Sequence, residues 1–450
     1  MNHIALEKQF NINNFAVAVK KNICLFFLFA AALTLIAYLP VSATVPILII
    51  VLGLSFGLFL EQTFLAPLFI LAFLIRIIFS IFLYNAILIK NEGGIYSGHG
   101  LFGDGYSYSV NAGLILDLWF RGERNLHVIA DEAKRLSASG NLGSYDFLNA
   151  IVYYFTGTSP FTMVFINCLA SVLTVLFVYQ IAKQLWNERA ARFAAFLTAF
   201  WPSTFFWSIQ NLKEPIITFL IVGLIWAFIK LKKQFRFYLI FAIIIFTVLL
   251  KMLRGFLVPV FYVLMVPGAM LFSSKHKKVF VFSLLALAGG AMLMVKLYYP
   301  DLIDPHKLLF LLQQKRAGRS YGNLAFMLNF STANILNLIM LLPVSFTIAL
   351  LAPFPWQLGS ISQISSLPEM LLFYYLIPAM LLGGRVLTKI KPKESWILIM
   401  CIFTIAFILS NIEGNVGTLF RHRSMILPVC FILIGVGLDK ANFKVSFHNQ

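Results

Sequence analysis

Acidic residues are scarce in this chain, which contains 17 Asp and Glu against 35 Lys and Arg among its 450 residues. Charged residues of all kinds make up only 12% of the sequence, whereas hydrophobic residues make up 60%. This composition excludes an ordinary soluble domain. The net charge of +18 does not indicate a nucleic-acid partner, because the basic residues lie in short clusters between apolar runs and not on one soluble face.

Cysteine is scarce as well. All four cysteines lie within apolar runs, and no two have the Cys-x-x-Cys spacing. We interpret them as small buried apolar residues and expect neither a disulfide framework nor a cysteine metal site. The sequence also lacks a dense set of carboxylates, so a divalent cation is left open as a cofactor and is not indicated.

Long apolar runs dominate the chain. Hydrocarbon offers no partners for backbone N–H and C=O groups, so a chain that crosses a membrane must do so as helices or as a closed barrel. The runs show no strand-like alternation, which favours helices. We predict an all-α polytopic membrane protein with about 12–14 transmembrane helices. The runs fall at about 23–39, 44–60, 64–88, 161–182, 190–209, 214–231, 237–251, 255–272, 279–298, 332–352, 367–383, 396–411 and 425–438.

Basic clusters indicate the orientation, because short cytoplasmic loops carry an excess of Lys and Arg. With the N-terminus inside, the clusters Lys230 to Arg236 and Lys275 to Lys278 are cytoplasmic. The third run then leaves the membrane and places a large first loop, residues 89–160, on the outer side. The basic cluster Arg385 to Lys393 and the basic C-terminal tail also indicate the cytoplasm, which disagrees with thirteen crossings and leaves the parity open around residues 298–332.

Three parts follow from this pattern. Residues 1–63 are expected to form an N-terminal cytoplasmic segment and an extra helical hairpin. Residues 64–438 form the main membrane domain with its outer loop, and residues 439–450 form a cytoplasmic tail.

The outer loop holds seven of the 17 acidic residues. Asp104 is the best catalytic candidate among them. It lies between Gly103 and Gly105, which predicts a tight turn that exposes the carboxylate at the membrane surface. From Tyr106 the pattern predicts an amphipathic helix to about Phe120. A solvated turn or a helix N-cap is the commoner role for such an aspartate.

Two further acids are candidates, one later in the outer loop and one beyond it. The stretch Gly143 to Pro160 predicts a re-entrant or interfacial helix, in which Asp146 is either a helix cap or a second catalytic acid. The stretch 190–215 predicts a hairpin whose tip carries polar residues at the outer surface. Lys213 and Glu214 at this tip are either interface residues or groups placed to meet a phosphate or a sugar hydroxyl.

Basic residues at expected outer turns suggest an anionic ligand. Lys251 and Arg254 lie between two apolar runs, against the usual charge bias, and an anionic lipid head is the simplest explanation. Arg421, His422 and Arg423 precede the last run. A guanidinium fork suits a phosphate or pyrophosphate, although interface snorkelling is the alternative.

The order of these motifs resembles a known family. Asp104-Gly-Tyr106 in the first outer loop is followed by a Gly-x-Ser-Pro ending at Pro160. Next come Ala-Ala-Arg-Phe-Ala-Ala-Phe, Trp-Pro-Ser and Leu-Lys-Glu-Pro between residues 190 and 215, and much later Phe-Arg-His-Arg-x-x-x-Leu-Pro ending at Pro428. The chain resembles the integral-membrane glycosyltransferases of the GT-C superfamily over about residues 64–438. It is similar in style to bacterial relatives of protein O-mannosyltransferases and aminoarabinose transferases.

The resemblance implies a GT-C-like membrane domain that uses a polyprenyl-phosphate sugar as donor. The acceptor would be a glycan, a lipid or a protein, on the outer face of the bacterial inner (plasma) membrane. Asp104 corresponds to the first-loop acid, with Tyr106 expected at the substrate. Arg421 and Arg423, with His422, Lys213 and Arg254 in support, are expected at the donor phosphate. Many members follow the first acid with another, whereas this chain has Gly105, which leaves the second acid open among Asp146, Glu214 and Asp117.

Two other functions compete with this hypothesis. An O-antigen-type polymerase or ligase also uses lipid-linked sugars, but its main outer loop is expected later in the chain and rich in Arg. A lipid-linked oligosaccharide transporter predicts charges inside spanning helices that face a cavity. We expect Arg76 to be the only clear buried charge, and one Arg does not make a translocation path.

Overall fold

The computed structural model describes residues 39–60, 63–90, 103–136, 142–255, 257–258, 343–344, 346–357, 361–413 and 415–441, with Ala30, Lys307, Phe310 and Gln314 described singly. The predicted runs at 23–39, 255–272, 279–298 and 332–352 lie largely outside these residues. The chain divides into two compact units. The first comprises Met1–Val172 and Ser208–Lys213, and the second comprises Leu173–Trp207 and Glu214–Gln450.

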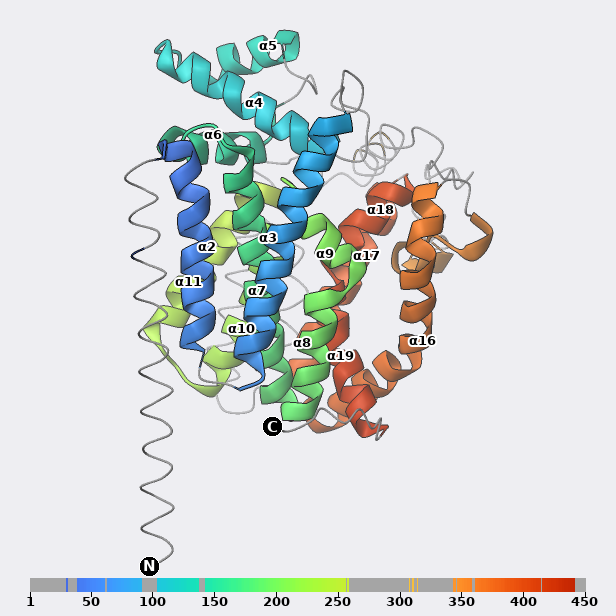
Figure 1. Ribbon diagram of the computed structural model, residues 1–450. Helices are drawn as coiled ribbons and strands as arrows, with labels where there is room; N and C mark the ends of the chain where they lie inside the picture. The colour runs from blue at the N-terminus through green and yellow to red at the C-terminus, as the bar shows by residue number, and fades with distance from the viewer. Residues whose placement is uncertain are drawn as a thin grey trace, which may run out of the picture. The chain divides into compact units, whose positions relative to one another are not determined.

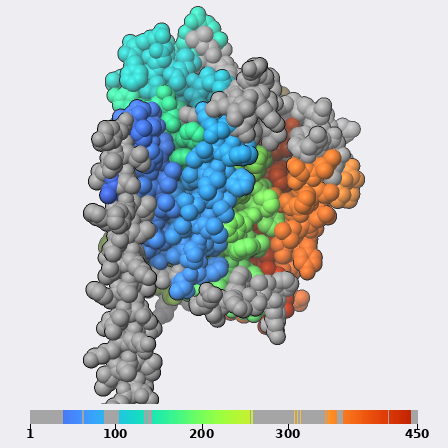
Figure 2. Space-filling view, in the orientation of Figure 1, coloured from blue at the N-terminus to red at the C-terminus, as the bar shows by residue number. Residues whose placement is uncertain are grey.

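The first unit contains two long apolar helices, α2 (Val41–Phe59) and α3 (Leu65–Lys90), that pack against each other (Figure 1). They approach closely at Gly53, where an added Cβ would lie 2.4 Å from the ring of Phe73. Large apolar side chains such as Leu52, Ile78 and Phe82 are exposed on α2 and α3, the two helices that form the blue surface in Figure 2. Exposure of this kind fits a helix pair that faces lipid.

The loop after α3 folds into helices. They are α4 (Gly103–Phe120), α5 (Leu126–Leu136) and α6 (Ser144–Thr156), with α7 (Pro160–Leu185) following. The helix predicted from Tyr106 to about Phe120 is confirmed, but the tight turn predicted at Gly103 and Gly105 is wrong, because both residues belong to the first turn of α4. An acid in a first turn is favoured by the helix dipole. Gly105 instead allows close packing, since an added Cβ would lie 3.2 Å from the carbonyl oxygen of Asn211.

The second unit is built around α19 (Leu427–Lys440), which packs between α16 (Ile361–Ile390) and α8 (Glu188–Phe200) (Figure 1). Small residues make this packing close. Gly435 of α19 lies against the backbone of Ala190 on α8, and Gly437 lies against the backbone of Ala379 on α16.

The remaining described helices of this unit are α10 and α11, which pack as a pair, and α17 and α18. Their bounds are Glu214–Lys233, Phe237–Arg254, Pro392–Ile412 and Val416–Arg423 respectively. A short 3-10 helix, η2, covers Pro355–Gln357.

The run predicted at 190–209 is not one continuous helix. It divides at Trp201 into α8 and α9 (Pro202–Ser208), and Trp201 itself has an extended backbone, with ψ of 125°. The physical reason is Pro202. A residue before proline is driven away from the helical region, and proline removes the N–H that would continue the helix.

Among the described residues, seven helices are long and apolar enough to cross a membrane, namely α2, α3, α7, α10, α11, α16 and α17. The bent pair α18 and α19, at 60°, makes an eighth if it is one broken span. The predicted all-α polytopic membrane architecture is therefore confirmed. The total of 12–14 crossings and the three-part division of the chain stay predictions, because several of the predicted runs fall outside the described residues.

Candidate functional site

A cluster of ionisable side chains in the second unit centres on Glu214. This glutamate opens α10 directly before Pro215, a position where proline costs no helix hydrogen bond and where a negative charge meets the helix N-terminus favourably. The side chain of Glu214 is only 1% exposed. A buried carboxylate is strongly unfavourable unless cations or hydrogen-bond donors surround it.

Three cationic or titratable groups surround this carboxylate. One Glu214 oxygen, Oε1, lies 3.1 Å from Nη2 of Arg254 at the end of α11. It also lies 3.1 Å from Nε2 of His422 and 3.5 Å from Nε of Arg421, both on α18. Four of the predicted site residues, separated by more than 200 positions, are thus within one cluster.

The short helix α18 is positioned from both ends. Its N-cap residue Asn415 accepts hydrogen bonds through Oδ1 from the backbone N–H groups of Gly417 and Thr418, at 2.8 and 3.3 Å. Near the other end, Nδ1 of His422 lies 2.9 Å from Oε1 of Glu413, the residue that follows α17. His422 therefore lies between two carboxylates. Sequence reasoning missed Glu413. Acidic residues are scarce in this chain, so an acid shortly before the Arg-His-Arg motif is a usable signal.

The side chains of the cluster differ in their exposure to solvent. Arg421 is 16% exposed, whereas the Arg254 and His422 side chains are 6% and 5% exposed. Arg421 is therefore the cation that an anionic ligand would reach first. The second oxygen of Glu214, Oε2, has no hydrogen-bond partner among the described residues. It can accept a hydrogen bond from a hydroxyl or water.

Arg423 occupies different surroundings from Arg421. Its Nη1 donates to the carbonyl oxygens of Leu350 and Ala352 at 2.9 and 2.6 Å, and its Nη2 lies 2.8 Å from the sulfur of Met370. Residues two apart on a helix point to different faces. The Arg-x-Arg pair, expected to hold one phosphate together, is thus split between the Glu214 cluster and these backbone carbonyls.

The other predicted site residues lie in the first unit. Asp104 and Tyr106 are both exposed, in the first turns of α4. Lys213 is half-buried, and its Nζ lies 5.9 Å from the ring centroid of Tyr108. Such a position over an aromatic face is favourable for a cation.

Asp146 is buried and both of its oxygens are occupied. Oδ1 accepts from Nδ2 of Asn111 at 2.9 Å, and Oδ2 accepts from the backbone N–H of Gly143 at 2.6 Å. Burial raises the pKa of the Asp146 carboxyl, against these hydrogen bonds. The contact with Gly143 caps α6, which is the structural role that the sequence left open.

The expected exposed tip at residues 210–214 is wrong for Gln210, Asn211 and Glu214, which are all buried. Asn211 is held by the hydroxyl of Tyr145 at 2.9 Å and donates to Oδ1 of Asn149 at 2.8 Å. Asn167 of α7 donates to the carbonyl oxygens of Gln210 and Leu212, both at 2.7 Å. Polar residues inside an otherwise apolar segment, such as Asn167, are the sequence signal for this buried network.

Arg76 is not the only buried charge, contrary to expectation. It is fully buried on α3 and donates to Ser208 Oγ and to the carbonyl oxygen of Ala72, both at 3.0 Å. Glu214, Glu369, Glu413 and Arg423 are buried as well. The sequence missed them because they lie at run boundaries, where side chains are expected at the interface.

Part of the chain matches a known family. Residues 144–295 match the family model described as dolichyl-phosphate-mannose-protein mannosyltransferase. The matched stretch is about a third of the chain and includes Asp146, Lys213, Glu214 and Arg254. This match confirms the predicted relation to integral-membrane glycosyltransferases of the GT-C superfamily. Among proteins of curated function, none matches the chain.

Several solved structures are similar at low identity, among them the following two. One is ArnT from Cupriavidus metallidurans bound to undecaprenyl phosphate, at 14% identity and a TM-score of 0.42, over 74% of this chain and 56% of that one. The other is the Archaeoglobus fulgidus oligosaccharyltransferase tethered with an acceptor peptide, at 14% identity and a TM-score of 0.43, over 84% of this chain and 50% of that one. The chain therefore spans about half the length of these structures.

Proposed function

We propose that this protein is a membrane glycosyltransferase that transfers a sugar from a polyprenyl-phosphate donor to a lipid, polysaccharide or protein acceptor on the non-cytoplasmic face. The observation that carries the proposal is the buried cluster of Glu214, Arg254, Arg421 and His422, two members of which lie in the family-matched stretch. The undecaprenyl phosphate bound in the ArnT structure supports this donor class.

Arg421 is proposed to bind the donor phosphate. It is the most exposed cation of the cluster, and a guanidinium can give two parallel hydrogen bonds to a phosphate. Glu214 is proposed to orient Arg421 and Arg254, because a carboxylate already paired with cations is a poor proton acceptor. In the reaction, the bond between the anomeric carbon and the phosphate oxygen breaks, and the leaving oxygen takes the electron pair. A cation that stabilises this developing charge lowers the barrier.

Asp104 is proposed as the base. The acceptor oxygen forms the new bond to the anomeric carbon and loses its proton, which a positioned carboxylate can accept. Asp104 suits this role better than Asp146 because it is exposed, whereas both oxygens of Asp146 hold donors inside the protein. Attack from the side opposite the phosphate inverts the configuration at the anomeric carbon.

The test compares two aspartates on one helix. Asp104→Asn should abolish the protein-dependent change in lipid-linked glycans, measured by mass analysis of membranes with and without the protein. Asp117→Asn is the matched comparison, since Asp117 is also exposed on α4 but its carboxylate is already paired with Arg121 at 2.7 Å, so it is not the proposed base. Full activity of the Asp104→Asn variant at normal abundance would remove Asp104 from catalysis.

A binding measurement tests the donor site separately. Purified Arg421→Ala protein should bind undecaprenyl phosphate about tenfold or more weakly, as expected for loss of a charge-assisted hydrogen bond. Arg421→Lys should recover part of this loss, because lysine keeps the charge but not the fork. Unchanged binding in Arg421→Ala would place the phosphate elsewhere.

A further inference from the structure

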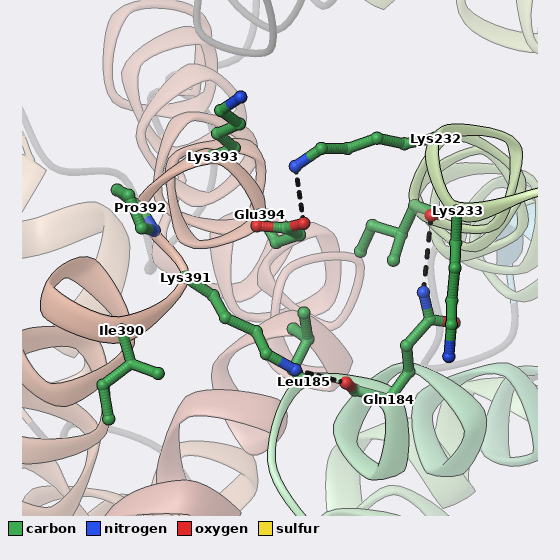
Figure 3. A pocket seen from close by; sticks show the side chains of 10 residues that line it. Gln184, Leu185, Lys232, Lys233, Ile390, Lys391, Pro392, Lys393 and Glu394 are labelled. Carbon is green, nitrogen blue, oxygen red and sulfur yellow. Dashed lines mark hydrogen bonds and ion pairs between the residues drawn. The ribbon is translucent and has the colours of Figure 1, made fainter. Parts of the chain in front are cut away.

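A second basic site lies in the second unit, at the other end of the helix that begins with Glu214. A cavity of about 440 Å³ opens where α7, α10 and α16 end and α17 begins (Figure 3). The helix α10 has 20 residues, so its two ends are separated by about 30 Å. The cavity is therefore distinct from the Glu214 cluster.

Four lysines and one glutamate line this cavity. Lys232 pairs with Glu394 at 2.6 Å, and Nζ of Lys391 donates to the carbonyl oxygen of Gln184 at 2.7 Å (Figure 3). Lys233 and Lys393 make no hydrogen bond or ion pair with any residue that the structure describes. Glu394 offsets one of the four lysine charges, so the lining carries three positive charges in excess.

The beginning of α17 adds to the positive potential. Its N-cap residue, Lys391, provides no side-chain hydrogen bond to the first turn, and Pro392 follows as the first helical residue. The backbone N–H groups of the next residues therefore point toward the cavity end without a capping side chain. The N-terminus of a helix of 21 residues also carries a partial positive charge that favours anions.

We propose that this cavity binds a phosphate group, and that its source is the head of an anionic membrane lipid. The cavity lies where spanning helices end, which is the depth of lipid head groups. Its lining also includes Ile390, whose exposed apolar side chain is one against which an acyl chain can pack. Basic pockets between spanning helices are known to recognise anionic lipid heads.

The experiment uses the full-length protein in nanodiscs of phosphatidylcholine alone or with an equal part of phosphatidylglycerol. Native mass spectrometry counts the phosphatidylglycerol molecules that stay bound. The variant Lys233→Gln/Lys393→Gln should retain about fivefold less phosphatidylglycerol than the wild-type protein for each lysine removed. Both side chains are solvent-accessible, so these substitutions leave the core intact.

A matched variant separates the cavity from the general basic surface. Arg385→Gln/Lys389→Gln removes the same charge from the same basic cluster, but neither residue lines the cavity. Retention of phosphatidylglycerol should stay at the wild-type level in this control. Equal losses in both double variants would overturn the proposal, because they indicate a diffuse electrostatic effect.

Added inorganic phosphate distinguishes the source of the ligand. A lipid head that also anchors by its chain should resist displacement by millimolar inorganic phosphate. Displacement by phosphate in wild-type protein, absent in Lys233→Gln/Lys393→Gln, assigns the cavity to a soluble phosphate and overturns the lipid source. Retention that is the same in wild-type and cavity variants, with and without phosphate, overturns the site itself.

Discussion

Arg421 and Arg423 are separated by one histidine, yet their guanidinium groups have different partners. Arg421 lies 3.5 Å from the carboxylate of Glu214, whereas Arg423 donates to backbone carbonyls and lies 4.9 Å from the ring of Phe420. A helix rotates by about 100° per residue, so two residues apart are about 200° apart. One arginine of the motif thus belongs to the Glu214 cluster, and the other joins α18 to its neighbours in the second unit.

Removing Glu214 should destabilise the protein, because Arg254 would remain buried without its carboxylate. We expect Glu214→Ala to lower the free energy of unfolding by about 3–5 kcal/mol, as for a broken buried ion pair. The double variant Glu214→Gln/Arg254→Met should recover much of the loss, since it removes both charges and keeps the volume. Chemical unfolding in detergent measures this cycle, and a double variant no more stable than Glu214→Ala would contradict the pairing.

The sequence could identify Glu214, Arg254 and Arg421 as polar groups near run boundaries, but not their mutual contacts. Their grouping depends on long-range packing of α10, α11 and α18, which spans more than 200 residues. The sequence also placed Asp146 correctly in a helix and left its role open between cap and acid. The hydrogen bond from Asn111, 35 residues away, could not be predicted from local pattern.

Asp146 should make stability depend on pH. Burial raises the pKa of this carboxyl above its ordinary value of 3.8, so the folded state holds the proton more tightly than the unfolded state. Its stabilising contribution is complete below pH 3.8 and is lost as the pH rises through the raised pKa. The melting temperature of wild-type protein relative to Asp146→Asn should therefore fall with rising pH.

A second variant, Asn111→Ala, tests the same pH dependence of stability. Without the amide donor, the ionised carboxylate loses a favourable hydrogen bond, so the pKa of Asp146 should rise further. The pH at which stability is lost should then move upward. A constant difference in melting temperature between wild type and Asp146→Asn across pH would show that Asp146 does not contribute this pH dependence.

Helix boundaries in this protein depend on specific side chains that a hydropathy pattern does not weigh. The run at 190–209 is largely apolar, yet α8 ends at Phe200 and α9 begins at Pro202. Glu369 of α16 stabilises the break by accepting hydrogen bonds from Nε1 of Trp201 and from the backbone N–H of Ser203, at 2.6 and 2.8 Å. The sequence predicted the existence of most described helices, but the hydropathy pattern missed this break because it does not weigh the effect of Pro202 on the backbone.

Two glycines allow α16 and α19 to pack closely. An added Cβ at Gly383 would lie 1.9 Å from the carbonyl oxygen of Leu433, and one at Gly437 would lie 1.8 Å from that of Ala379. Each contact is backbone, which cannot move away without separating the helices. We expect Gly383→Ala and Gly437→Ala each to cost about 1–3 kcal/mol of stability through overpacking.

Gly384→Ala is the control for this prediction. Nothing lies within 4 Å of a Cβ added at Gly384, although it neighbours Gly383 in the same helix. Alanine also favours a helix over glycine by up to about 1 kcal/mol, so Gly384→Ala should be neutral or stabilising. Thermal unfolding of the three variants measures the effect, and equal changes in all three would contradict close packing as the cause.

At the scale of the whole chain, the spanning helices α10 and α17 of the second unit carry lysines at one end and buried glutamates at the other. Lys232 and Lys233 at the end of α10 lie at one cavity with Lys391 and Lys393 at the beginning of α17. At their other ends, α10 begins with Glu214 and α17 is followed by Glu413, both of which contact His422. Two basic clusters that the sequence assigned separately to the cytoplasm therefore lie together, as one membrane face requires.

This arrangement predicts the orientation of the protein. In a background without the four native cysteines, Lys233→Cys should react with a membrane-impermeant thiol reagent only after cells are permeabilised. Lys251→Cys, in the last turn of α11 near Arg254, should react in intact cells. The excess of lysines at the cavity end favours the cytoplasm by the positive-inside rule. The opposite labelling pattern would place the Glu214 cluster in the cytoplasm, and sugar transfer on the outer face would then require a different site.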